Sequence, residues 1–434
     1  GAQIVAAQGD AATPVAATVT LVEQRDVEIP DARIISLSPD GRLIAAAKPI
    51  GGYQRGQLCV YDVATLAEQA CADLSGLEAG LRIEDVAWSP DGAYLAFAEM
   101  GFVYLRDGDL WLMDTATGAL TNLDDDGFAG NLPLFSDEAS DQTISLPVNP
   151  AFSPDGRTVA FSRSILRGGE WFGNEIAVVS VDGGTPETLT RVTFDTPGVV
   201  YFGIRWAPDA TRLYYSVHYP SPNEPRNGIW SVDANGLNQR QILGATDPDQ
   251  GAPAVAQVSP RGDKLLVFYV VAAGRTDFGK FPLYALVDVE TGAAEPLTVP
   301  GSDAPAYAWI SLASISPDGS KLLTVTRLTD PDNQVFVRDV DGGDATRIGE
   351  PLTAAGPIGW GLIPTWASDG AVLITGGGAL SSATLLRIEG SAAPPVATPE
   401  PGPSPQAGTP VTGAIAPGAT VLVNDDGVRI RAAP

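Results

Sequence analysis

The sequence contains one histidine, His218, and this limits the catalytic chemistry that the chain could perform. A Ser-His-Asp arrangement would need His218, which directly precedes the Pro-rich run Tyr219–Pro222. A histidine at the end of a strand or in such a loop more often makes a structural hydrogen bond. No serine lies in a Gly-x-Ser-x-Gly elbow, and sites with several histidine ligands are excluded. The sequence therefore predicts that the protein is not an enzyme.

Acidic residues could bind a metal, because carboxylate oxygens are the ligands that calcium takes. Residues 124–127 (Asp-Asp-Asp-Gly) and 330–333 (Asp-Pro-Asp-Asn) are the candidates, but neither has the spacing of a calcium-binding loop. A solvated acidic turn explains both. A carboxylate pair could also serve a glycosidase, but 52 acidic residues give too many pairs to choose from. We expect no cofactor and no metal, with calcium as the alternative.

The two cysteines, Cys59 and Cys71, lie six residues on either side of Thr65. If Thr65 lies in the turn between two strands, the cysteines face each other across the hairpin. A disulfide there is geometrically feasible and suits an oxidising compartment. Two small buried thiols are the alternative.

A recurrent tetrapeptide, Ser-Pro-Asp-Gly, indicates which strands and turns carry the residues discussed above. It begins at Ser38, Ser89, Ser153 and Ser316, and degenerate copies begin at Ala207, Ser259 and Ala367. Proline presets φ for a tight turn, Asp bonds back to the backbone, and Gly accepts positive φ. Each copy lies between two apolar runs, which predicts a hairpin. Seven copies, 51 to 64 residues apart, indicate a repeat architecture.

A second turn that begins with Asp follows each of the first six hairpins, and at residues 114–118 and 288–292 it reads Asp-x-x-Thr-Gly. Each repeat is therefore four strands, a to d, and seven such antiparallel sheets form an all-β, seven-bladed β-propeller. The last repeat lacks an outer strand after residues 384–388, whereas residues 16–28 form a strand without a partner. We predict that this N-terminal strand completes the last blade and closes the ring.

These repeats resemble the TolB-type (WD-repeat-like) β-propeller of bacteria over roughly residues 30 to 390. That resemblance implies the fold, but such propellers occur in envelope scaffolds, peptidase accessory domains and lyases, so it does not imply one function. We expect a flexible segment at 1–14, the propeller at 15–390, a Pro/Ala/Thr-rich linker at 391–418 and a β-hairpin at 419–434. The hairpin, with an Asp-Gly turn, resembles the start of a truncated bacterial Src-homology-3-like module.

Variable loops lie on one face of such a propeller, where the b–c and d–a connections meet, and aromatic and arginine side chains gather there. These residue types are typical of binding surfaces, although each could instead pack its own loop. Gly168, Gly169 and Gly173 flank the two aromatic residues that we expect to be most exposed. The predicted binding residues are Trp171, Phe172, Tyr53, Phe102, Tyr104, Tyr219, Arg226 and Phe278.

The charge balance of 26 basic against 52 acidic residues makes nucleic acid an improbable partner, because a net charge of −26 repels phosphate backbones. No run approaches the roughly 20 apolar residues that a membrane span needs. The chain starts at Gly1 without an initiator Met, which predicts removal of a signal segment and an extracytoplasmic location.

Together these features predict a non-catalytic binding or scaffold propeller, exported to the bacterial cell envelope or surface. Its partner is a protein or glycan that meets the b–c/d–a face. Self-association through terminal segments, residues 1–28 or 391–434, would make it a subunit of an extracellular assembly. The alternative is a hydrolase or lyase acting on polysaccharide or peptide at the propeller channel.

Overall fold

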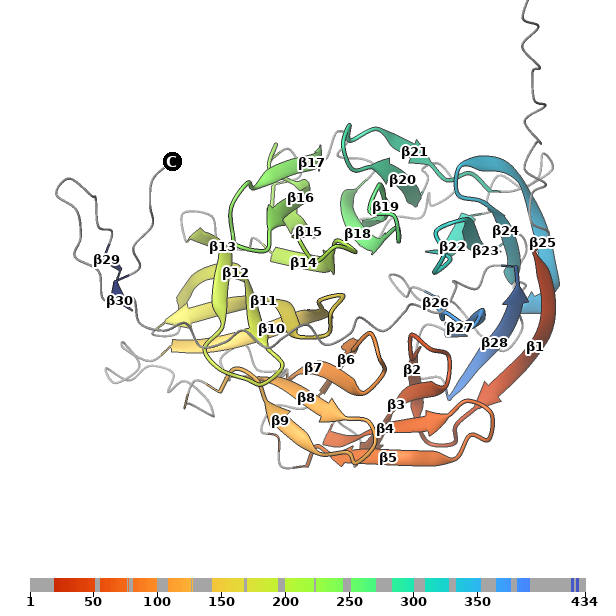
Figure 1. Ribbon diagram of the computed structural model, residues 1–434, viewed down its shortest axis with the longest axis horizontal. Coiled ribbons are helices and arrows are strands. Elements are labelled where there is room, and N and C mark those ends of the chain that lie inside the picture. The colour runs from red at the N-terminus through yellow and green to blue at the C-terminus, as the bar shows by residue number, and fades with distance from the viewer. Residues whose placement is uncertain are drawn as a thin grey trace, which may run out of the picture. The chain divides into compact units, whose positions relative to one another are not determined.

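The computed structural model divides the chain into two compact units, Gly1–Pro394 and Pro395–Pro434. The first unit holds most of the described residues and consists of seven four-stranded antiparallel sheets, or blades, arranged around a ring (Figure 1). The structure describes residues 19–50, 55–75, 77, 81–99, 108–125, 127, 143–167, 170–193, 200–221, 224–244, 251–270, 283–299, 309–327, 333–352, 364–375, 381–390, 423–424 and 427–428. The prediction of an all-β, seven-bladed propeller is confirmed.

Each of the first six blades takes four consecutive strands from the chain. Blade 1 is β2 (Arg33–Leu37), β3 (Leu43–Ile50), β4 (Arg55–Asp62) and β5 (Glu68–Asp73). Blade 2 is β6 (Leu81–Trp88), β7 (Tyr94–Glu99), β8 (Leu110–Asp114) and β9 (Leu120–Asn122). Blade 3 is β10 (Thr143–Phe152), β11 (Thr158–Arg167), β12 (Glu170–Ser180) and β13 (Glu187–Thr193).

The next three blades follow the same order of strands. Blade 4 is β14 (Val200–Trp206), β15 (Arg212–His218), β16 (Gly228–Asp233) and β17 (Arg240–Gly244). Blade 5 is β18 (Ala252–Val258), β19 (Lys264–Val270), β20 (Tyr284–Asp288) and β21 (Ala294–Pro296). Blade 6 is β22 (Trp309–Ile315), β23 (Lys321–Arg327), β24 (Asn333–Asp339) and β25 (Gly342–Leu352).

Blade 7 joins the two ends of the propeller. It contains β26 (Thr365–Trp366), β27 (Ala371–Thr375) and β28 (Ser382–Glu389), and its outer strand is β1 (Thr20–Glu28) from the start of the chain. β1 pairs antiparallel with β28, and Arg25 lies opposite Leu385. The predicted closure by the N-terminal strand is therefore confirmed, although the described strand begins at Thr20 rather than at residue 16.

The Ser-Pro-Asp-Gly turns are held by a recurring set of hydrogen bonds. In blade 1 the Ser38 hydroxyl donates to Asp40 Oδ1 (2.6 Å) and accepts from the Leu43 N–H (2.9 Å). Gly41 adopts φ +79°, which glycine reaches without steric cost. The same serine contacts recur at Ser89, Ser153 and Ser316. The buried serine hydroxyl thus has both a donor and an acceptor within its own turn, and this set of bonds requires Ser and Asp at these two positions.

The Asp-x-x-Thr turns use a different local bond. Asp62 Oδ1 accepts from both the N–H and the hydroxyl of Thr65, each at 2.8 Å. Asp114 and Asp288 do the same with the threonine three residues later. These hydrogen bonds, led by the one from the threonine hydroxyl, lower the pKa of each aspartate.

The hydrophobic core is a ring of small clusters, one at each junction between neighbouring blades. Leu95 and Phe97 pack against blade 1, for example, whereas Phe161 and Ala177 pack against blade 2. Indole groups add hydrogen bonds across the junctions: Trp88 Nε1 donates to Ser36 Oγ at 2.9 Å, and Trp206 Nε1 to the Ala151 carbonyl at 3.0 Å. Seven junctions of this kind replace a single large core.

The second unit contains the described strands β29 (Val423–Asn424) and β30 (Gly427–Val428), which pair antiparallel. Asn424 lies opposite Gly427, so Gly427 belongs to the second strand. The predicted linker and the remainder of the predicted module fall outside the described residues. Among the described residues, no helix is long and apolar enough to cross a membrane.

Candidate binding surface

The structure describes four of the eight predicted binding residues. Tyr53, Phe102, Tyr104 and Phe278 lie outside the described residues. Trp171 and Phe172 belong to β12, and only residues 168 and 169 separate this strand from β11, so the two aromatic residues lie in a strand rather than in a loop. Ile165 pairs with Gly173 and Leu166 with Trp171, which makes Phe172 the extra residue of a β-bulge.

The other two predicted residues, Tyr219 and Arg226, contact each other in the b–c loop of blade 4. The Arg226 guanidinium lies over the Tyr219 ring, 4.2 Å from its centroid. The side chain of Arg226 is 49% exposed and also forms an ion pair with Glu224 (2.7 Å), whereas Tyr219 is 8% exposed. A cation stacked on an aromatic ring keeps its outer face available to solvent.

Polar side chains, one of them buried, hold this loop in one conformation. Asn227, 3% exposed, accepts from the Tyr219 N–H (2.5 Å) and donates to the Ser221 carbonyl (2.8 Å). Gln241 donates to the Pro225 carbonyl (2.9 Å), and Trp230 Nε1 donates to the Arg226 carbonyl (2.9 Å). The loop therefore presents Arg226 on a fixed backbone, which lowers the entropic cost of binding.

Tyrosines beneath the loop support it. Tyr219 shares a hydrophobic cluster with Tyr201 and Tyr215, whose rings pack edge-on at 5.6 Å. Burial raises the pKa of Tyr215 to about 12 and raises the pKa of Tyr201 further. The Tyr215 hydroxyl meets Gln239 Nε2 at 2.5 Å, so this buried phenol has a polar partner.

His218 is the last residue of β15, next to this loop. Burial lowers its pKa to about 4, and a hydrogen bond with the Pro253 backbone opposes that shift only in part. The imidazole is consequently uncharged near neutral pH and contributes no positive charge to the surface around Arg226.

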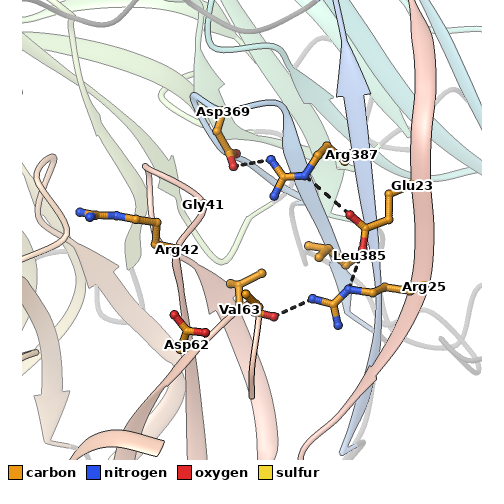
Figure 2. Close-up of a pocket in the computed structure, with 10 residues that line it drawn as sticks. Glu23, Arg25, Gly41, Arg42, Asp62, Val63, Asp369, Leu385 and Arg387 are labelled. Carbon is orange, nitrogen blue, oxygen red and sulfur yellow. Dashed lines mark hydrogen bonds and ion pairs between the residues drawn. The ribbon is translucent and has the colours of Figure 1, made fainter. Parts of the chain in front are cut away.

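A pocket on the opposite face, at the junction of blades 7 and 1, was not predicted from the sequence. Charged side chains surround an open depression of about 440 Å³. Figure 2 shows these side chains. Arg25 donates to the Val63 carbonyl (2.6 Å) and pairs with Glu23 (2.9 Å), and Arg387 pairs with Asp369 (2.6 Å). The lining residues are Glu23, Arg25, Gly41, Arg42, Asp62, Val63, Ala64, Asp369, Leu385 and Arg387.

The charges in this pocket largely pair with one another and connect β1 to blade 1. Three arginines and three carboxylates line it, so their formal charges cancel. Residues more than 300 positions apart meet there only because the ring closes, and no local motif marks them. We interpret the pocket as part of the closure rather than as a ligand site.

The first acidic stretch is bonded to the backbone around it. Asp124 is buried and accepts from the Leu110 N–H at 2.6 Å, and Asp125 accepts from the Gly127 N–H at 2.9 Å. Residues 330–332 of the second stretch lie outside the described residues, and Asn333 is buried in β24. Asp124 therefore faces the protein interior.

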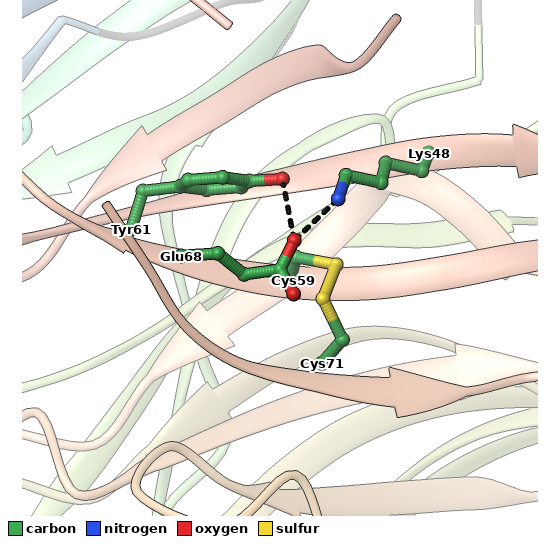
Figure 3. The surroundings of a disulfide bond; sticks show 5 residues. All are labelled: Lys48, Cys59, Tyr61, Glu68 and Cys71. Atoms are coloured by element: carbon green, nitrogen blue, oxygen red, sulfur yellow. Dashed lines mark hydrogen bonds and ion pairs between the residues drawn. A yellow bond between two sulfur atoms is a disulfide. The ribbon is translucent and has the colours of Figure 1, made fainter. Parts of the chain in front are cut away.

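The predicted disulfide is confirmed. Cys59 on β4 and Cys71 on β5 lie directly opposite each other and are bonded (Figure 3). The carboxylate of Glu68 lies beside the bond, where it meets Lys48 Nζ and accepts from the Tyr61 hydroxyl (3.4 Å).

Comparisons with known proteins support the fold. No known family model matches the chain. Dipeptidyl-peptidase 5 of Porphyromonas gingivalis is 25% identical over 189 residues, which cover 42% of this chain but only 23% of the peptidase. The β-propeller domain of Cps50 (Swd1) from Myceliophteria thermophila matches with a TM-score of 0.52 and 10% identity, over 85% of this chain and 99% of that domain.

TolB structures are also among the matches. TolB from Acinetobacter baumannii is 15% identical, with a TM-score of 0.40, over 83% of this chain and 80% of that protein. At such identities, similarity to solved structures establishes the fold alone.

Proposed function

We propose that this chain is a non-catalytic binding propeller whose b–c/d–a face meets a protein partner outside the cytoplasm. The observation that carries the proposal is the blade 4 loop, where Arg226 is stacked on Tyr219 on a backbone fixed by Asn227. Arginine and tyrosine are the residues that most often dominate binding energy at interfaces. A cation presented in this way attracts the carboxylates of a protein partner.

The proposed location rests on a separate feature. The Cys59–Cys71 disulfide persists in an oxidising compartment, such as a bacterial envelope or cell surface. Assembly with further copies through the terminal segments, residues 1–28 or 391–434, belongs to the same proposal, with residues 20–28 of the first segment already paired with β28 of their own chain. A glycan is the second class of ligand that an aromatic and arginine surface accepts.

Affinity capture with the tagged full chain, from envelope extract of the source organism, tests the proposal with Arg226→Ala. Truncating a stacked arginine at the centre of an interface costs about 2 kcal/mol or more, so we expect at least a ~30-fold weaker interaction with the captured partner. Arg212→Ala is the matched control, because Arg212 is also exposed but lies at the opposite end of blade 4. Equal binding of the partner by both variants would contradict the assignment of this loop.

The similarity to a dipeptidyl-peptidase favours one second candidate, a propeller that takes part in peptide hydrolysis. Chromogenic dipeptide amides test it directly with the purified chain. We expect no turnover above the uncatalysed rate, and turnover that survives repurification would favour the peptidase candidate over the scaffold.

A further inference from the structure

The disulfide in blade 1 is part of a cluster of three side chains of the kinds that bind metals. Sulfur atoms of Cys59 and Cys71 and a carboxylate oxygen of Glu68 all lie within 4.8 Å of one another. Cys59 is buried, Cys71 is partly exposed and Glu68 is exposed. An ion could therefore approach from the Glu68 side, where Figure 3 shows the carboxylate beside the sulfur atoms.

The strand ladder, not the disulfide alone, keeps these residues together. Cys59 and Cys71 form one pair in the β4–β5 register, between the pairs Leu58–Ala72 and Val60–Ala70. Glu68 lies opposite Tyr61 at the end of the same ladder. Opening the disulfide leaves this backbone pairing in place, so the two thiols continue to face each other.

We propose that reduction of the disulfide converts this cluster into a zinc site with Cys59 Sγ, Cys71 Sγ and one Glu68 oxygen as ligands. Thiolates select zinc over calcium and magnesium, and zinc takes sulfur at about 2.3 Å and carboxylate oxygen at about 2.0–2.2 Å in tetrahedral geometry. Such geometry separates ligand atoms by about 3.5–4 Å, which is within the span of the cluster. A water molecule completes the fourth position.

The reaction balances with a dithiol as reductant. A thiolate of the dithiol attacks the sulfur of Cys71, Cys59 leaves and takes a proton, and the second thiol of the reagent then releases Cys71. Two electrons and two protons pass to the protein, and the dithiol becomes a disulfide. Zinc then displaces the two thiol protons.

Lys48 and Tyr61 act as positioning residues. Both contact Glu68 Oε2, which orients the carboxylate and leaves its other oxygen for the metal. The formal charges also cancel: two thiolates and a carboxylate give −3, whereas Zn²⁺ and the Lys48 ammonium give +3. A partly buried sulfur site without net charge avoids a large desolvation cost.

Cobalt titration of the full-length protein tests this site. The protein is reduced with dithiothreitol, freed of it by anaerobic gel filtration and titrated with Co²⁺, which gives a thiolate-to-metal charge-transfer band, and then with Zn²⁺, which removes the band. We expect one equivalent to bind to the reduced protein and none to the oxidised protein. Glu68→Gln should bind at least ~10-fold more weakly, and Cys71→Ser should lose the charge-transfer band of the pair.

Glu290→Gln is the matched control, because Glu290 is an exposed carboxylate in a turn of blade 5, and it should bind as the wild type does. Circular dichroism of the reduced protein should match that of the oxidised protein. Absence of the band in folded, reduced protein, unfolding on reduction, or wild-type affinity in Glu68→Gln would each overturn the proposal.

Discussion

At the scale of single residues, the side chains with the strongest energetic roles are buried polar groups whose partners come from adjacent strands. Glu175 is one: its side chain is fully buried in β12 and pairs with Arg163 on β11 (2.5 Å) and Arg191 on β13 (2.7 Å). The three residues lie opposite one another in the register of blade 3. A buried carboxylate between two cations tolerates loss of a partner poorly.

Glu175→Gln should therefore destabilise the protein by about 3 kcal/mol, because Arg163 would stay largely buried without its counter-ion. The measurement is the urea midpoint at constant slope. Glu187→Gln, an exposed carboxylate at the start of β13, serves as the control and should change stability by less than about 0.5 kcal/mol. If Glu175→Gln destabilised the protein no more than Glu187→Gln does, the ion pairs of Glu175 would not be important for stability.

His218 makes a residue-scale prediction about pH. Its pKa is about 4 in the folded protein and about 6.5 when unfolded, so the unfolded chain binds the proton more tightly. The stability that the neutral imidazole contributes is complete above pH 6.5 and is lost as pH falls towards 4, by up to about 3 kcal/mol.

Between pH 6.5 and pH 4, the free energy of unfolding should fall by about 3 kcal/mol more in the wild type than in His218→Gln. Denaturant unfolding at both pH values measures this difference. Taking the difference between the two proteins removes the contribution of the many carboxylates that titrate in the same range. Identical pH profiles would mean that His218 is accessible to protons in the folded state.

At the scale of elements, the turns were predictable from the sequence because their information is local. The contacts of Ser38 with Asp40 and Leu43 involve neighbours in the chain, so the tetrapeptide alone predicts them. Blade 5 shows how a degenerate copy persists: Arg261 occupies the Asp position, and Ser259 donates instead to Asp263 (2.7 Å).

Glycine at the seam offers an element-scale prediction. A Cβ at Gly41 would clash with the Asp369 carboxylate of blade 7, whereas one at Gly127 would meet no atom of the described residues within 4 Å. Both glycines have φ +79°, so an alanine pays the same backbone strain at either position. Gly41→Ala should lower stability by about 1 kcal/mol more than Gly127→Ala in thermal or urea unfolding, and equal losses would mean that Asp369 moves aside freely.

The candidate binding surface was less predictable than the turns. Aromatic and arginine residues in variable loops are typical of interfaces, which is why the sequence nominates Tyr219 and Arg226, and that role stays a prediction. Their stacking, and the bonds by which Asn227 and Gln241 hold the loop, are marked by no motif. Trp171 was placed in a loop because its glycine neighbours suggest one, but strand pairing with Leu166 extends almost to the turn. Backbone pairing of this kind decides whether such a position belongs to a strand, and the residue types around it do not.

At the scale of the whole molecule, closure was predictable by counting strands, because one unpaired strand at the start matched one missing strand at the end. The polar contacts that stabilise the closure were not predictable from the sequence. Gln24 on β1 donates to the Glu350 carbonyl (3.1 Å) and accepts from the Glu350 N–H (2.9 Å), which joins the outer strands of blades 7 and 6. Residues 326 positions apart carry no sequence pattern that pairs them.

Deleting residues 1–28 should leave β28 as an unpaired edge and expose the apolar residues that Val27 covers. We expect association through that edge, detected by light scattering, and a lower unfolding temperature. Deleting residues 1–18 is the control and should leave the scattering and the unfolding temperature of the full chain unchanged, since the described pairs of β1 begin at Thr20. A stable, monodisperse 1–28 deletion would contradict closure by β1.

The pairing of Thr20 with Glu389 also has a consequence for biosynthesis. A ribosome releases the first segment of this chain long before it makes the segment that will receive it. Until β28 has been synthesised, β1 has no strand to pair with, and the ring of blades stays open. Closure of the ring therefore follows synthesis of β28 and depends on a contact of very long sequence separation, which forms slowly and leaves the nascent chain vulnerable to aggregation.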